Sequence, residues 1–333
     1  MFEEILKKES SFRLKQAKKA VFQDLIENWD KVTTLPQNLR QKLQENCPIQ
    51  ELRKERILVS KDNQTNKVLF ELKDGFKIES ILMRHEDGRN TVCVSSQVGC
   101  TMNCQFCATG QQGFKRNLSS SEIVEQILFF ARILKKTGTK ITNVVFMGMG
   151  EPFLNYDNVL GTIKILNDKD GFNLGARHIS ISTCGIVGGI KKLSGEKLQV
   201  NLAISLNASN NELRSKLMPI NKIYSIEKIL AAVDDHIKKT RRRVMFEYLM
   251  IDGVNDSLEQ VKELAKLLKK PLCFANLISY NPIGHSRFKP SPGWKIKKFK
   301  EILEKAKIPV TQRYRFGREI KAACGQLAGT DNL

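Results

Sequence analysis

From about residue 90 onward, short β-branched runs alternate with longer amphipathic stretches. The short runs predict six strands, at Thr91–Ser95, Ile141–Met147, His178–Ser182, Val200–Ser205, Val244–Met250 and Cys273–Tyr280. The amphipathic stretches predict helices at Ser121–Lys136, Tyr156–Asn167, Ile186–Ser194, Ile226–Lys239, Leu258–Lys269 and Lys295–Lys305. The first helix follows a capping-box pattern, Ser119-Ser120-Ser121-Glu122. Such alternation predicts an α/β fold with a parallel sheet, either a partial barrel or an open doubly wound sheet.

Several of the predicted strands carry small polar residues on one face only. The polar faces hold His178, Ser180 and Ser182 in one strand, Asn201, Ala203 and Ser205 in the next, and Thr91, Cys93 and Ser95 in the first. A parallel strand buried on both sides is expected to be apolar on both faces. The pattern therefore indicates an internal cavity that holds a polar ligand, with the helices packed on the apolar side.

The first 85 residues differ from the rest. Residues 1 to about 60 have apolar positions at helical spacing, and Lys67–Leu72, a turn at Asp74-Gly75 and Phe76–Met83 predict a small β unit. We expect an accessory domain over residues 1–85 that resembles a small binding module, a main α/β domain over residues 86–305 and a C-terminal segment over residues 306–333.

The formal net charge of +20 favours a polyanionic partner such as nucleic acid, although a solvated Lys-rich surface would produce the same charge. The N-terminus lacks the apolar run of a signal peptide, and no stretch approaches the length of a membrane span. We therefore expect a cytoplasmic protein that does not associate with membranes. In that compartment, eight cysteines favour metal binding or catalysis over a disulfide framework.

Three of these cysteines form a C-x3-C-x2-C motif, Cys100, Cys104 and Cys107. Three thiolates can hold three irons of a [4Fe–4S] cluster and leave the fourth iron open for a ligand that is not protein. S-adenosylmethionine (SAM) can fill that position through its amino and carboxylate groups. The alternative is a zinc site with Cys93 or a histidine as fourth ligand, but the second cysteine or histidine pair typical of zinc sites is not evident.

The motif resembles the cluster loop of the radical SAM superfamily, and its surroundings resemble the RlmN/Cfr family of RNA adenine methyltransferases. The similar segments are Cys93–Gly110, Phe146–Pro152, Glu247–Asp256 and Ala322–Leu327, and the resemblance covers nearly the whole chain. It implies a partial (β/α)6 radical-SAM barrel with a small, mostly helical N-terminal accessory domain.

The resemblance also implies the ligands of the cofactors. Cys100, Cys104 and Cys107 would hold the [4Fe–4S] cluster. The residues that would bind SAM are Gly150, Glu151, Ser182, Ser205, Leu206, Asn207 and Asn281. Asn207 departs from the family pattern, because relatives commonly have histidine there.

Three catalytic residues follow from the same resemblance. Cys324 would carry the methyl group as S-methylcysteine, Cys93 would resolve the protein–RNA adduct through a transient disulfide with Cys324, and Glu79 would accept a proton. Judged without the family, Cys324 would be a small buried residue and Glu79 a surface carboxylate. The remaining cysteines, Cys47, Cys184 and Cys273, match no motif, and we assign them structural roles.

The implied reaction is methylation of C2 of an adenosine in 23S ribosomal RNA, and also of an adenosine in the tRNA anticodon loop. It requires an electron donor such as flavodoxin or ferredoxin and a thiol that reduces the disulfide. Basic runs at 13–19, 241–243 and 295–321 could bind RNA phosphates. Two alternatives stay open: Cfr-type methylation of adenine C8, and a zinc-stabilised RNA-binding protein without catalysis.

Overall fold

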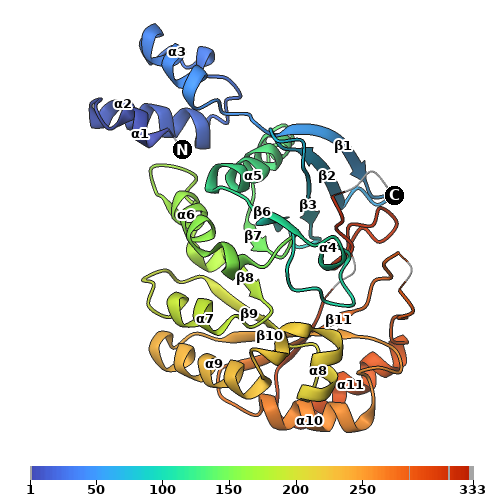
Figure 1. Cartoon of the computed structure of the whole chain (residues 1–333). Coiled ribbons are helices and arrows are strands. Elements are labelled where there is room, and N and C mark those ends of the chain that lie inside the picture. The colour runs from blue at the N-terminus through green and yellow to red at the C-terminus, as the bar shows by residue number, and fades with distance from the viewer. Residues whose placement is uncertain (1, 285, 314–315, 330–333) are drawn as a thin grey trace.

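The computed structural model describes residues 2–284, 286–313 and 316–329 (Figure 1). Within these ranges, the main sheet contains ten strands in the order β1-β2-β3-β4-β7-β8-β9-β10-β11-β12. The sheet curves into a partial barrel with helices on its outer side (Figure 1), which confirms the α/β fold class expected from the sequence.

The strands of the main sheet are β1 (Arg53–Val59), β2 (Thr65–Glu71), β3 (Lys77–Arg84), β4 (Asn90–Cys93), β7 (Asn143–Phe146), β8 (Ile179–Thr183), β9 (Asn201–Ser205), β10 (Val244–Met250), β11 (Cys273–Ser279) and β12 (Val310–Gln312). Strands β1 to β4 pair antiparallel. Strands β4 and β7 to β12 pair in parallel. All six predicted strands are thus confirmed as neighbours in the parallel part of the sheet.

The helices of the barrel are α5 (Ser120–Lys135), α6 (Tyr156–Asn167), α7 (Val187–Leu193), α8 (Asn211–Leu217), α9 (Ile226–Thr240), α10 (Leu258–Leu268) and α11 (Gly293–Lys305). The predicted helices are all present, and α8 is an addition. Short helical turns cover Pro152–Asn155, Ala176–His178 and Pro219–Lys222. A hairpin of β5 (Gln97–Gly99) and β6 (Phe114–Asn117) encloses a short helix, α4 (Ala108–Gln111).

Local sequence explains where the helices begin. The Ser119 side chain accepts a hydrogen bond from the Glu122 backbone, and the Glu122 side chain accepts one from the Ser119 backbone, which completes the predicted capping box of α5. Ser257 and Gln260 form the same reciprocal pair at the start of α10. These contacts satisfy backbone N–H groups that a helix leaves unpaired at its first turn.

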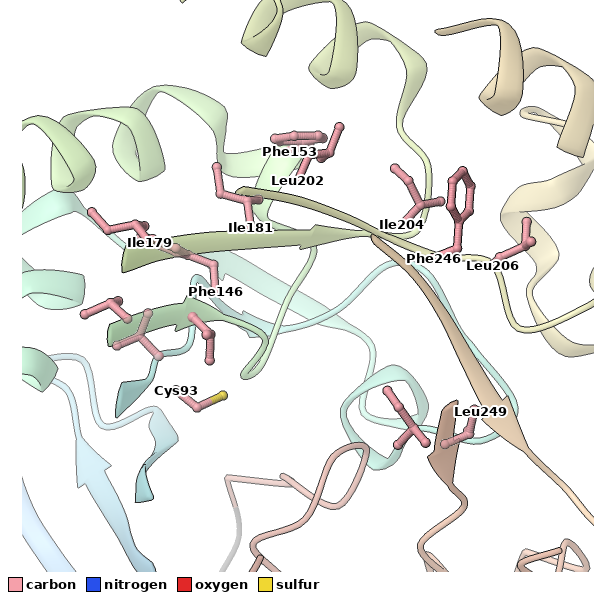
Figure 2. Close-up of a cluster of buried hydrophobic side chains, with 14 of the residues drawn as sticks. Cys93, Phe146, Phe153, Ile179, Ile181, Leu202, Ile204, Leu206, Phe246 and Leu249 are labelled. Atoms are coloured by element: carbon pink, nitrogen blue, oxygen red, sulfur yellow. The ribbon is translucent and has the colours of Figure 1, made fainter. Parts of the chain in front are cut away.

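The core lies between the sheet and the outer helices. Ile181 and Leu202 are buried on the side of their strands that faces the helices (Figure 2). Because side chains alternate along a strand, Ser182 and Ser205 point to the opposite side, where they line a cavity. The alternation of apolar and polar positions in the sequence therefore corresponds to a real division between core and cavity.

The expectation of helix up to about residue 60 is wrong for residues 53–59, which form strand β1. Within the described part of the chain this strand pairs with β2 alone and lies at the edge of the sheet, with Arg53, Lys54 and Arg56 exposed. Charged residues on an edge strand discourage pairing with other chains. The apolar spacing of β1 is too weak to reveal a strand, because its conformation depends on pairing with β2.

The N-terminal helices form a smaller core of their own. They are α1 (Glu3–Leu6), α2 (Ser11–Lys18) and α3 (Gln37–Asn46), with helical turns at Lys19–Gln23 and Trp29–Lys31. Trp29 is fully buried and packs edge-on against Phe2, and the cluster extends to Val124 and Leu128 on α5. The β1–β3 strands continue the main sheet, whereas the helices sit at its margin (Figure 1). The expected boundaries at residues 85 and 305 remain predictions.

Among the described residues, no helix has both the length and the apolar character needed to cross a membrane.

Buried His236 on α9 predicts a loss of stability in acid. Burial and the nearby Arg242 lower the pKa of His236 to about 4, and its Nε2 has no hydrogen-bond partner. Because the unfolded chain binds a proton below about pH 6.5, the free energy of unfolding should fall as the pH drops from 6.5 towards 4. We expect His236 to contribute about 2 kcal/mol to the decrease between pH 6.5 and 5.

This contribution can be measured by urea unfolding of the reduced protein at several pH values. His236→Gln should flatten the pH dependence relative to the parent protein. His178→Gln, at an exposed histidine, is the matched control. If the free energy of unfolding of the His236 variant depended on pH as steeply as that of the parent protein, the assignment would be contradicted.

Candidate radical SAM site

A single cavity at the carboxyl ends of the barrel strands brings together six cysteines from distant parts of the chain. Its lining includes Cys93 at the end of β4, the motif cysteines Cys100, Cys104 and Cys107, Cys184 after β8, and Cys324 near the C-terminus. Ligand sites of parallel βα folds gather at this edge of the sheet. The expected grouping of these residues is therefore present in the structure.

The motif cysteines lie on the loop between β5 and α4. The backbone N–H of Cys100 donates to the Gly113 carbonyl at 2.9 Å, which closes the base of the loop where the β5–β6 hairpin begins. The N–H of Cys107 donates to the Cys104 carbonyl at 3.1 Å and tightens the turn between them. All eight cysteines are free thiols.

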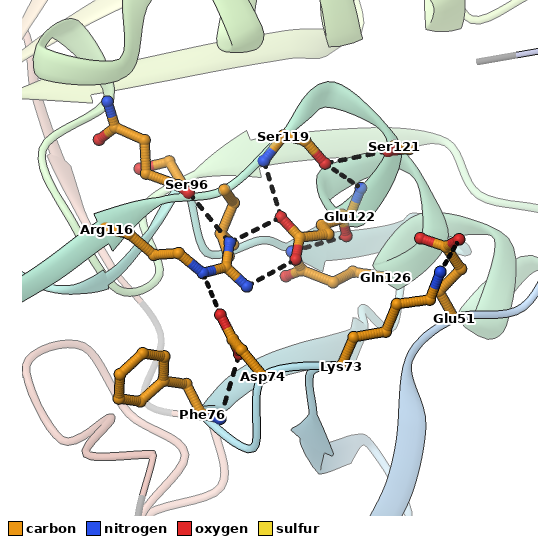
Figure 3. A network of polar contacts seen from close by, with 12 residues as sticks. Glu51, Lys73, Asp74, Phe76, Ser96, Arg116, Ser119, Ser121, Glu122 and Gln126 are labelled. Atoms are coloured by element: carbon orange, nitrogen blue, oxygen red, sulfur yellow. Dashed lines mark hydrogen bonds and ion pairs between the residues drawn. The ribbon is translucent and has the colours of Figure 1, made fainter.

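The loop of the motif cysteines, residues 100–107, which we call the cluster loop, lies within the β5–β6 hairpin, and Arg116 on β6 ties this hairpin to the sheet. Its guanidinium donates to Glu122 at the start of α5 and to Asp74 in the β2–β3 turn (Figure 3). Hydrogen bonding to Glu122 is the largest influence that raises the pKa of Arg116. One side chain thus joins the cluster loop, the first barrel helix and the antiparallel strands.

The chemistry of the three motif thiols fits an iron–sulfur cluster. Burial raises the pKa of Cys107 to about 11 and raises that of Cys100 further. Buried thiols of this kind are protonated at neutral pH unless a metal takes the place of the proton. Among the described residues, no three His, Cys, Asp or Glu side chains are close enough together to hold a single metal ion.

The Gly148-x-Gly150-Glu151 turn follows β7 and enters the cavity. A Cβ on Gly148 would lie 2.6 Å from the Val94 carbonyl oxygen. Gly150 has a φ of +103°, and a Cβ there would collide with Gln97. Only glycine fits both positions. Glu151 is buried and accepts N–H groups of Phe153 at 3.0 Å and Cys184 at 2.7 Å. Its carboxylate lines the cavity with lone pairs left for a ligand ammonium group.

Ser182 and Ser205 meet on neighbouring strands, 3.2 Å apart between their hydroxyl oxygens. Both donate to the same carboxylate oxygen of Glu247 on β10, at 2.5 and 3.2 Å. The second oxygen of Glu247 is buried without a hydrogen bond and lies 3.7 Å from the guanidinium of Arg313. This group forms a polar floor able to bind the charged end of a ligand.

Asn281, after β11, has a buried side-chain oxygen without a hydrogen-bond partner, while its amide donates to the Cys324 carbonyl at 3.3 Å. An unpartnered buried acceptor that lines a cavity fits a ligand donor.

The other two predicted SAM residues are positioned differently. Asn207 lines the cavity, but its side-chain oxygen accepts the Leu249 N–H at 2.9 Å and its backbone has φ +58°. Leu206 is fully buried, and its carbonyl accepts a hydrogen bond from Arg214. The structure therefore places Leu206 behind the cavity wall, where it can support the residues that line the cavity but does not line it itself.

Cys93 and Cys324 share a positively charged neighbour, Arg313, which follows β12. Burial raises the pKa of Cys93 to about 12, and the Arg313 charge opposes this shift. Solvent reaches Cys324 through the cavity, yet the surrounding protein desolvates its thiol and raises its pKa, again against the effect of Arg313. The guanidinium thus favours the thiolate form of both cysteines.

Glu79, the predicted proton acceptor, lies on β3 beside the cavity but does not line it. Its Oε1 is paired with the Lys67 ammonium at 2.8 Å. Its Oε2 accepts the N–H groups of Ala328 at 2.6 Å and Gly329 at 3.1 Å. Both carboxylate oxygens are therefore occupied in this conformation.

Sequence reasoning missed Glu247, Arg313 and Cys184 as residues of the site. Glu247 had a usable signal, because it is a lone charge within the apolar strand Val244–Met250. Arg313 lies among many basic residues. Cys184 matches no motif, yet it lines the cavity beside the motif cysteines.

A sequence model of the radical SAM superfamily matches residues 94–268. Among similar chains, a protein of Carboxydothermus hydrogenoformans, described as dual-specificity RNA methyltransferase RlmN, is 48% identical over 96% of this chain and 92% of its own length. Another protein so described, from Dictyoglomus thermophilum, is 48% identical over 96% of this chain and 91% of its own length.

Similarity extends to a solved structure over nearly the whole chain. The crystal structure of a radical SAM methyltransferase from Sphaerobacter thermophilus superposes with a TM-score of 0.96 and 43% sequence identity, covering 98% of this chain and 96% of that one. The superfamily match, the relatives and the solved structure therefore indicate the same kind of protein as the three-cysteine cavity does. The chain belongs to the radical SAM superfamily and, within it, to the RlmN family of RNA methyltransferases.

Proposed function

We propose that the protein is a dual-specificity methyltransferase that methylates C2 of an adenosine in 23S ribosomal RNA and of an adenosine in tRNA. The observation that carries this proposal is one cavity that joins the three-cysteine loop to Cys93 and Cys324. The relatives described as dual-specificity RNA methyltransferases support the substrate class, because they match this chain over 96% of its length.

Cys100, Cys104 and Cys107 would hold the [4Fe–4S] cluster and leave one iron for SAM. Bound there, the cluster supplies the electron that cleaves SAM and begins radical chemistry. Glu151 would accept hydrogen bonds from the amino group of SAM. Asn281 offers a free acceptor oxygen on the same cavity wall.

The polar floor supports a role in holding the methionyl end of SAM. Ser182 and Ser205 already share Glu247, so an incoming carboxylate would compete for their hydroxyl donors. Arg313 can then balance the charge of both carboxylates.

Cys324 would act first as a nucleophile. Its thiolate would take a methyl group from one SAM by displacement, forming a carbon–sulfur bond as the bond to the sulfonium breaks. A thiolate is needed because the protonated thiol is a poor nucleophile. Arg313 favours that state electrostatically.

Cys93 would act last. After the methyl carbon of Cys324 has joined the adenine ring, attack by the Cys93 thiolate on the Cys324 sulfur would break the bond between that sulfur and the transferred carbon. The carbon would keep the electron pair, take up a proton and leave as the methyl group of the released RNA. This step leaves a Cys93–Cys324 disulfide, and two electrons from a thiol reductant restore both thiols. Flavodoxin or ferredoxin is the class of protein that would reduce the cluster.

Glu79 would accept the proton lost from the adenine ring. Since Ala328 and Gly329 occupy one of its oxygens and Lys67 the other, this role requires the C-terminal segment to move first.

Neither alternative has comparable support. A zinc-stabilised RNA-binding protein would be expected to resemble zinc proteins, whereas the chain belongs to the radical SAM superfamily. The relatives reported above carry the RlmN name, which favours C2 over C8 as the methylated carbon.

Product analysis tests the site of methylation. Reconstituted, reduced enzyme should convert adenosine in 23S ribosomal RNA and in tRNA to 2-methyladenosine, measured by mass spectrometry of digested RNA against 2-methyl and 8-methyl standards. Detection of 8-methyladenosine alone would show that the enzyme methylates C8 and not C2. Modification of one RNA class only would refute dual specificity.

The carrier role predicts that Cys324→Ala abolishes RNA methylation, because no other group can receive the methyl. Iron and sulfide content should stay at the level of the parent protein, since Cys324 is not a cluster ligand. Cys47→Ala, at a half-buried cysteine among the N-terminal helices, is the matched control. Normal turnover of the Cys324 variant would disprove the carrier role.

The resolving role predicts that Cys93→Ala accumulates a covalent protein–RNA species. The adduct should appear as a slowly migrating band in denaturing gels that disappears after ribonuclease treatment. The Cys47→Ala control should show no such band. Free methylated RNA as the sole product of the Cys93 variant would contradict the assignment.

A further inference from the structure

Lys67 on β2 is a buried lysine that the proposed reaction does not use. Its ammonium lies 2.8 Å from Glu79 Oε1, and the two side chains are 6% and 4% exposed. Lysine is almost never buried to this extent unless it is paired. A buried ion pair adds little net stability, so stability alone does not account for it.

The pair contacts both ends of the loop that carries Cys324, residues 321–329, which we call the carrier loop. Before Cys324, the Lys321 carbonyl accepts a hydrogen bond from Lys67 Nζ at 3.3 Å. After Cys324, the N–H groups of Ala328 and Gly329 donate to Glu79 Oε2 at 2.6 and 3.1 Å. One ion pair thus secures the loop where it enters and where it leaves.

Between these ends, the carrier loop contacts the cluster side of the cavity. The N–H of Ala108 donates to the Gly325 carbonyl at 2.8 Å, and the Thr109 hydroxyl donates to the Leu327 carbonyl at 2.6 Å. Both donors belong to α4, which begins directly after Cys107. Helix α4 and the Lys67–Glu79 pair therefore hold the carrier loop from different elements of the fold.

Close packing leaves little space for the ends of the carrier segment to shift. A Cβ on Gly329 would lie 2.6 Å from the Lys77 carbonyl oxygen. A Cβ on Gly317, just before the loop, would lie 2.8 Å from a side-chain carbon of Thr65 on β2. Strands β2 and β3 thus form the platform on which the segment rests.

We propose that Lys67 is a positioning residue whose ion pair with Glu79 fixes both ends of the carrier loop and holds Cys324 where it receives its methyl group. This inference rests on the proposed function, because it assumes that Cys324 is methylated. Lys67 does not line the cavity, so it acts on the reaction through the loop.

The test compares Lys67→Met with the parent protein in the loading of Cys324. Both proteins are incubated with SAM, and S-methylation of the Cys324 peptide is followed by mass spectrometry. We expect loading on the order of 10–100-fold slower in Lys67→Met, because small misplacements of a reacting group cost this much. Hydrogen–deuterium exchange over residues 321–329 should become faster, while iron content stays unchanged.

Three further variants separate positioning from general destabilisation. Lys67→Arg keeps the charge and should restore most of the loading. Lys18→Met breaks another partly buried pair, with Asp168 at 2.5 Å, and should leave loading and carrier-loop exchange unchanged. If Lys67→Met does not fold, the double variant Lys67→Met/Glu79→Gln removes both charges and should show the same slow loading.

Loading at the parental rate with unchanged exchange over residues 321–329, in the single or the double variant, overturns the positioning role. Failure of the parent protein itself to load a methyl group on Cys324 overturns the proposed function instead. The two failures are therefore distinguishable in one experiment.

Discussion

The site depends on contact between two segments more than 200 residues apart. Hydrogen bonds from Ala108 and Thr109 to the carbonyls of Gly325 and Leu327 join the helix after the cluster loop to the C-terminal segment. This contact places the loop that carries Cys324 beside the helix that follows the motif cysteines, and the Lys67–Glu79 pair supports the two ends of the same loop.

A second constraint is the balance of positive and negative charge in a buried cavity. Glu151 and Glu247 are both buried, and each accepts hydrogen bonds from neighbouring strands or turns, although one oxygen of Glu247 has no donor. Arg313 brings a positive charge to the side where Cys93 and Cys324 meet the cavity. Charged groups of opposite sign thus surround the cavity, where low polarity strengthens their interactions.

Much of the fold could be predicted from local patterns. The six barrel strands and their helices follow from alternation and capping, and Val244–Met250 and Tyr156–Asn167 match their predicted bounds. Strand β1 was missed because pairing, and not its own sequence, determines its conformation. Short elements around the cluster loop, such as α4 and the β5–β6 hairpin, were missed for the same reason.

The candidate site was predictable in its residue types more than in its contacts. The spacing of Cys100, Cys104 and Cys107 favours an iron–sulfur cluster over zinc, and resemblance to the family adds Cys93 and Cys324. Glu79 was expected as a proton acceptor, but sequence could not reveal that its oxygens are occupied.

Motif spacing and alternation are local properties of the chain, so they were enough to indicate an α/β fold and a three-cysteine site. Folding in three dimensions brings the distant groups together: Lys67 with Glu79 and Lys321, and Glu247 with Ser182 and Arg313. Such contacts depend on how strands and loops are brought together in space, and no local pattern encodes them.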